Sequence, residues 1–226
     1  MKTEMLSREQ LLAAAPSIFA LEPWDKVSQK YSFVPTINVI EQMAKEGFVP
    51  VRAQQSRTKI EGKLDFTKHL IRFRQLTSLN PDVNKMVGEV IPEVLLVNSH
   101  DRSSSYQLSA GLYRLVCLNG MVVCDATFAS LRIKHSGNIA NDVLEATYKV
   151  AADFPRIIGK VEQFKSVTLS IDEQEHFAKL AIGLRWEHGK APITPLQLLA
   201  PRRQEDIGDS LWLVYQRAQE NLIRGG

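Results

Sequence analysis

A chain of 226 residues, 44% of them hydrophobic and 23% charged, is long enough to bury a full core and does not have the composition of a disordered protein. Its formal net charge of +3 is modest, so overall charge alone singles out no class of partner. No apolar run is long enough to span a bilayer, and the first residues lack the continuous apolar segment of a secretory signal. We therefore expect a cytoplasmic protein with no membrane partner.

The first 47 residues are predicted to be mainly helical. Ser7 and Gln10 have the spacing of a capping box at the start of a short helix. Thr36 is placed to cap a second helix, whose apolar residues recur on one side, and Gly47 is well placed to end it.

Residues 48–135 predict an antiparallel sheet. Alternating residues indicate strands over 48–55 and 68–75, and Pro50 places the first of these near an edge because proline cannot donate to a central ladder. In the second strand Ile71 and Phe73 alternate with Arg72 and Arg74, which predicts one packed face and one basic face. Short polar links join the further strands, which favours a meander since parallel strands need long crossovers. These strands are expected over 92–98, 106–118 and 121–128, with 131–134 as a continuation.

The Asn119-Gly120 pair predicts a two-residue hairpin turn in which Leu118 pairs with Met121 and Arg114 with Asp125. Both faces of this hairpin are apolar, so helices or another subunit should cover it, and we expect a homo-oligomer. The two cysteines, Cys117 and Cys124, would share a face without lying opposite one another, and we expect two reduced thiols rather than a disulfide.

Beyond residue 137 the apolar spacing becomes helical. It predicts a helix over 139–154 that Pro155 breaks or kinks, and Ser170 with Glu173 forms a second capping box. Further helix starts are predicted at Thr194-Pro195 and at Asp209.

Strands first and helices second indicate an α+β fold, an antiparallel β-meander backed by helices with a helical C-terminal part. We expect a single domain over residues 1–226. It would comprise a helical N-terminal part (1–47), the sheet (48–135) and a helical part (138–226).

Few residue patterns indicate catalysis. Ser99, His100 and Asp101 are the residue types of a catalytic triad, but sequence neighbours cannot generally form that relay, and a turn with local backbone hydrogen bonds fits them better. The histidines lack the spacing of a metal-ligand pair, and there is neither a Cys-x-x-Cys motif nor a glycine-rich phosphate-binding loop. We expect a protein that is not an enzyme and uses no metal or other cofactor.

Positive charge is concentrated between residues 51 and 75. This segment contains seven basic residues and only two acidic ones, Glu61 and Asp65, which gives a local excess of five positive charges. If the two strands share a face, this stripe suits a phosphate backbone; the alternative is a solvated strand face with a basic loop. Phe66, Phe73 and Tyr106 could stack on bases or, as is commoner in alternating strands, belong to the core. The candidate nucleic-acid-binding residues are Arg52, Arg57, Lys59, Lys63, Lys68, Arg72 and Arg74.

The central stretch VNSHDRSSSYQLSAGLYRLVCLNGMVV, residues 97–123, resembles the signature of a phage, plasmid and prophage family, the domain of unknown function numbered nine-thirty-two. Three other blocks resemble the same family: GFVPV near residue 50, HLIRFR near residue 70 and QENLIRGG near residue 220. The resemblance keeps open a ligand role for the loop of Asn98, Ser99, His100, Asp101 and Arg102.

The mobile-element setting implied by this resemblance suggests two functions. The first is a non-enzymatic nucleic-acid-binding protein, with single-stranded DNA favoured, similar to a single-strand annealing recombinase. The second is an anti-defence module of the anti-CRISPR or anti-restriction kind, whose partner would be a host defence protein.

Overall fold

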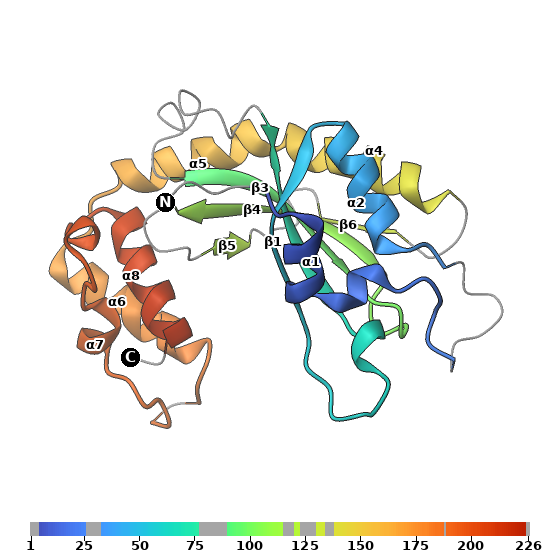
Figure 1. Ribbon diagram of the computed structural model, residues 1–226. Coiled ribbons are helices and arrows are strands. Elements are labelled where there is room, and N and C mark those ends of the chain that lie inside the picture. Colours follow the sequence, from blue (N-terminus) through green and yellow to red (C-terminus); the bar gives the residue numbers. More distant parts are fainter. Residues whose placement is uncertain are drawn as a thin grey trace. The chain divides into compact units, whose positions relative to one another are not determined.

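The computed structural model describes residues 5–25, 33–76, 90–114, 120–122, 130–133, 138–187 and 189–224 (Figure 1). The chain divides into two compact units, Met1–Pro155 and Arg156–Gly226. The helical region predicted from residue 138 onward is thus shared between them, because α4 (Ile139–Ala152) belongs to the first unit. Among the described helices, none is both long and apolar enough to cross a membrane.

The first unit is built on a six-stranded sheet. Its strands pair antiparallel in the order β1-β2-β3-β4-β5, and β6 pairs with β4 beside β5. The strands are β1 (Phe48–Gln55), β2 (His69–Gln75), β3 (Val90–Asn98), β4 (Tyr106–Arg114), β5 (Gly120–Val122) and β6 (Ser130–Ile133). The predicted α+β meander is confirmed, with β6 as a second neighbour of β4 rather than a continuation of the preceding strand.

Two faces of this sheet follow from the register. His69 pairs with Asn98, Ile71 with Leu96 and Phe73 with Val94, so these side chains share one face, which we call the helix face. The opposite face, here the arginine face, carries Arg72, Arg74 and Glu93. Ile71, Phe73, Arg72 and Arg74 are all buried, so both faces of β2 are covered.

Helices α2 (Thr36–Lys45) and α4 pack against the sheet and against each other. Apolar residues that recur at helical spacing are buried on one side of each helix. They include Val39 and Met43 of α2 and Val143 and Val150 of α4. At the end of α2, Gly47 adopts φ +82°, which glycine accepts without strain, and the predicted helix stop is confirmed. Two shorter helices, α1 (Arg8–Ala14) and η1 (Pro16–Phe19), precede α2.

The predicted Asn119-Gly120 turn register is wrong. Met121 pairs with Leu112 and Gly120 with Tyr113, so Gly120 belongs to strand β5. The true partner of Met121 lies six residues before the predicted one, an even shift that keeps every side chain on the same face. Alternation could not distinguish the two registers for that reason. Leu118, Asp125 and both cysteines lie outside the described residues.

The helix starts were predicted well, with corrections at Thr36 and at Asp209. Ser7 and Gln10 form a reciprocal capping box in α1, and Ser170 with Glu173 does so at the start of α6 (Ile171–Gly183). Thr36, in contrast, is the first residue of α2 and does not cap it. Its hydroxyl is buried among histidines instead.

The second unit is mainly helical in its described residues and begins within helix α5 (Phe154–Ser166). Pro155 separates α4 from α5 by lying in the first turn of α5, where its missing N–H costs nothing. Thr194 caps α7 (Pro195–Leu199), as predicted, and Ser210 rather than Asp209 precedes α8 (Leu211–Arg224). The core of this unit consists of Ala178, Ile193, Leu198 and Ala218, with Phe177, Trp186 and Leu222 packed against it.

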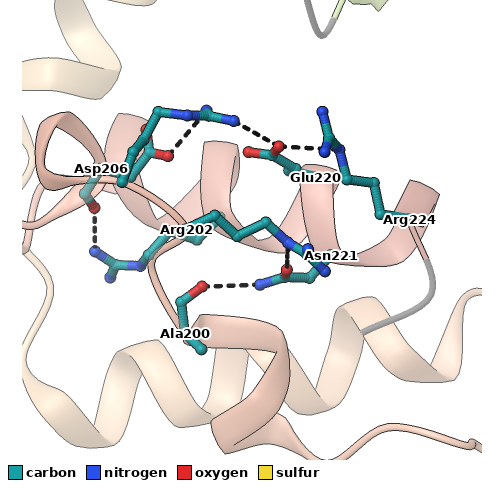
Figure 2. Close-up of polar contacts among 8 residues, drawn as sticks. Ala200, Arg202, Asp206, Glu220, Asn221 and Arg224 are labelled. Carbon is teal, nitrogen blue, oxygen red and sulfur yellow. Dashed lines mark hydrogen bonds and ion pairs between the residues drawn. The ribbon is translucent and has the colours of Figure 1, made fainter. Parts of the chain in front are cut away.

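A polar network fastens the segment between α7 and α8 to α8 (Figure 2). Glu220 accepts from Arg203 at 2.6 Å and from Arg224 at 3.1 Å, while Arg203 also reaches Asp206 at 3.1 Å. Asn221 Nδ2 donates to the carbonyls of Leu198 and Ala200, at 2.8 and 2.9 Å, and its Oδ1 accepts from Arg202. Because Glu220 and Asn221 are almost fully buried, these two residues of the QENLIRGG block serve packing within this unit.

Candidate functional site

Four of the predicted nucleic-acid-binding residues lie exposed on the hairpin formed by β1, β2 and the loop between them. We call residues 52–68, which comprise the end of β1 and the loop that leads to β2, the basic hairpin; a hydrogen bond from Ser56 N to Lys68 O at 2.7 Å closes the loop. The loop extends beyond the strand ends in Figure 1. In the part of the chain that the structure describes, these four cations have no ion-pair partner. They are Arg52, Arg57, Lys59 and Lys68.

Arg72 and Arg74 occupy a different environment, which corrects the predicted exposed stripe. Arg52 pairs with Arg72 and does share its face, as predicted. However, Arg72 is 5% exposed and Arg74 3% exposed. Both guanidinium groups bind the carboxylate of Glu93, which is fully buried. These two arginines are therefore components of the interior and not a phosphate-binding surface.

Glu93 is the residue that the prediction missed. It stands alone among apolar residues in the sequence VIPEVLLV of β3, where an unpaired carboxylate would be costly to bury. Arg72 donates to it through Nε at 2.5 Å and Nη2 at 3.0 Å, and Arg74 through Nε at 2.5 Å. A single acidic residue in an apolar strand, next to a strand with alternating arginines, is the signal from which this pairing could be predicted.

The fifth hairpin cation, Lys63, is held by the signature loop, which we define as residues 98–102. Its Nζ lies 3.0 Å from Asp101 Oδ2 and 4.5 Å from the centroid of the Trp24 ring. The side chain of Lys63 is 21% exposed and that of Asp101 only 4%. Lys63 is thus engaged within the protein, unlike the four exposed cations.

The signature loop is a tightly hydrogen-bonded turn. Ser99 Oγ accepts from Ser104 N at 2.8 Å and donates to Ser104 O at 3.2 Å, while Asp101 Oδ1 accepts from Ser103 N at 2.9 Å. Arg102 adopts φ +66°, an uncommon conformation outside glycine that lets the chain reverse. Burial acts to raise the pKa of Asp101, but the hydrogen bonds from Ser103 and Lys63 outweigh it and lower the pKa to about 2.

Two buried histidines, His69 of β2 and His100 of the signature loop, meet at Thr36. Thr36 Oγ1 lies 3.0 Å from His69 Nε2 and 3.1 Å from His100 Nε2, and it accepts from Asn98 Nδ2 at 3.1 Å. His69 Nδ1 lies 2.9 Å from Ser17 Oγ and 3.2 Å from the carbonyl of Thr67. The cluster joins η1, α2, β2 and the signature loop on the helix face.

The proton positions in this cluster follow from its partners. A carbonyl can only accept, so Nδ1 of His69 carries the hydrogen and Nε2 accepts the single hydroxyl hydrogen of Thr36. His100 Nε2 must then donate to Thr36 Oγ1. Together with the donor Asn98 Nδ2, it fills the two acceptor sites of the Thr36 hydroxyl oxygen. Burial lowers the pKa of His69 to about 4, which keeps the ring neutral as this scheme requires.

The aromatic residues are divided between the core and the hairpin. Phe73 and Tyr106 are fully buried, so the core alternative is correct for both, while Phe66 is half-buried at the base of the hairpin. Tyr106 donates its hydroxyl to Val34 O at 3.1 Å. The turn interpretation of Ser99 and Asp101 is supported by the hydrogen bonds described above. Across the described residues, no three His, Cys, Asp or Glu side chains gather as metal ligands.

The fold and the matched sequence blocks define an α+β protein with a helix-backed meander and a signature loop that is buried at Asn98, Ser99 and His100. The chain belongs to the family described as "Domain of unknown function (DUF932)", whose model matches residues 23–226. It is 38% identical over 221 residues to the UPF0380 protein YafZ of Escherichia coli K12 and 37% identical to the UPF0380 protein YfjQ of the same strain. Each alignment covers 98% of this chain and 78% of the relative. No solved structure matches the chain significantly.

Proposed function

We propose that the protein is a non-enzymatic nucleic-acid-binding protein whose basic hairpin contacts the phosphate backbone, with single-stranded DNA as the favoured ligand. The observation that carries this proposal is the set of four exposed hairpin cations without ion-pair partners among the described residues. Several exposed lysines on the helices are paired with neighbouring glutamates, as Lys149 is with Glu145 and Lys179 with Glu175. Cations that are not neutralised locally are the ones available to phosphates.

The chemistry of the hairpin favours binding without sequence preference. Lysine and arginine on a projecting loop neutralise phosphates and leave the base edges of a single strand available for pairing, as annealing requires. Half-buried Phe66 at the hairpin base is the aromatic residue best placed to contact a base. We further propose that copies assemble side by side, since the outer edge of β6 carries no strand partner within the described residues.

The test is the salt dependence of binding to a labelled oligothymidylate. The triple variant Arg57→Gln, Lys59→Gln, Lys68→Gln should weaken binding and make the slope of log affinity against log salt shallower by about 2, from ~0.7 per phosphate contact. The matched control replaces Lys149, Lys165 and Lys179 with glutamine, which removes the same net charge from helix-paired positions. The control should leave the slope unchanged.

Equal effects of the two triple variants would contradict a hairpin site. If the parent binds neither DNA nor RNA at low salt, the proposed function is wrong and the anti-defence alternative, with a host defence protein as partner, takes its place.

A further inference from the structure

The signature loop and the basic hairpin are joined at several points. Lys63 Nζ contacts Asp101 Oδ2 at 3.0 Å, and His100 N donates to Phe66 O at 3.0 Å. Trp24, whose ring lies under Lys63, donates from its backbone to His100 O at 3.1 Å. The loop thus grips the returning half of the hairpin through both side chains and backbone.

The ion pair between Lys63 and Asp101 is the contact in this group that depends on the charge of Asp101. Its carboxylate is 4% exposed, so solvent screens it less than it screens a surface pair. The same carboxylate is fixed by Ser103 N on the turn side, which holds Oδ2 toward Lys63. A partly desolvated pair of this kind restricts a loop that otherwise samples many conformations.

We propose that Asp101 is a positioning residue, which latches the basic hairpin in the conformation that presents its exposed cations to a nucleic acid. This inference rests on the proposed function and assigns a role to the signature loop. Asp101 carries a negative charge and touches no phosphate; it acts through Lys63. Without the latch the hairpin adopts the binding conformation for only part of the time, and the apparent affinity falls by that fraction.

The direction in which Asp101→Asn changes nucleic-acid affinity distinguishes a latch from a simple charge effect. Asp101→Asn removes one negative charge near the hairpin, which by electrostatics alone would strengthen nucleic-acid binding. Loss of the latch weakens it instead. Asparagine retains an oxygen for Ser103 N, so the turn is preserved. Glu61→Gln is the matched control, because exposed Glu61 lies on the same hairpin and forms no ion pair among the described residues.

The experiment measures oligothymidylate binding and hydrogen exchange of residues 56–66 in the parent, Asp101→Asn and Glu61→Gln proteins. In Asp101→Asn we expect affinity to fall about tenfold, if the hairpin is binding-competent about a tenth of the time, with an unchanged salt slope because no phosphate contact is lost. Exchange of residues 56–66 should accelerate while β3 stays protected. Glu61→Gln should bind as tightly as the parent or slightly tighter, with unchanged exchange.

Unchanged exchange together with equal or tighter binding in Asp101→Asn would overturn the latch. If the parent binds no nucleic acid, the proposed function fails by itself, and the exchange data still decide whether Asp101 holds the hairpin. Should Asp101→Asn fail to fold, Lys63→Met provides the same exchange measurement from the other partner. Unaltered exchange in that variant would equally exclude the latch.

Discussion

Replacing Glu93 with glutamine tests the buried charge cluster of the arginine face. The change keeps the side-chain volume but leaves the guanidinium groups of Arg72 and Arg74 without their shared carboxylate. Glu93 is fully buried, and the arginine side chains are 6% and 3% exposed, so water cannot replace the missing charge. Removing one partner of a buried ion pair typically costs about 3–5 kcal/mol. We expect a loss of that size in the free energy of unfolding.

Urea unfolding followed by far-UV circular dichroism measures this loss. With a slope of about 2 kcal/mol per molar urea, the midpoint should fall by roughly 2 M. The control is Glu41→Gln, which breaks the exposed pair between Arg8 and Glu41 and should cost no more than about 1 kcal/mol. Simultaneous replacement of Arg72, Arg74 and Glu93 by apolar residues of similar volume should recover most of the loss. A cost below about 1 kcal/mol for Glu93→Gln would refute the reasoning.

Two further predictions concern pH and assembly. Burial lowers the pKa of His69 from 6.5 to about 4, so between these pH values the unfolded chain binds more protons than the folded protein. The free energy of unfolding should therefore fall by roughly 3 kcal/mol as the pH falls from about 7 to about 4. His69→Gln should remove most of that slope in urea titrations at several pH values; an identical slope in the variant would exclude His69 as its source. Sedimentation velocity at micromolar concentration should give particles heavier than the 25.5 kDa chain, and a single species of that mass would contradict assembly through the β6 edge.

The sequence predicted the local elements better than the long-range pairing. Capping boxes at Ser7 and Ser170 and the helix stop at Gly47 depend on residues within one turn of each other, and all three were confirmed. Met121 was assigned to the wrong partner because a register shift of six residues preserves the alternation of faces.

The candidate site was only partly predictable for a related reason. Alternation correctly placed Arg72 and Arg74 on the face opposite Ile71 and Phe73, but it carries no information on whether that face is covered. Thr36 shows the same limit: the local pattern indicated a cap, whereas its hydroxyl is recruited by His69 and His100, which are 33 and 64 residues away along the chain.

The hydrogen bonds from α8 to the carbonyls at the end of α7 couple the unfolding of these two helices. At five residues α7 is too short to persist alone, and the Asn221 amide that satisfies Leu198 and Ala200 belongs to α8. Displacing α8 therefore unravels α7 at the same time. Amide exchange or proteolytic cleavage within 195–199 therefore reports whether α8 is docked, although the segment lies outside α8 itself.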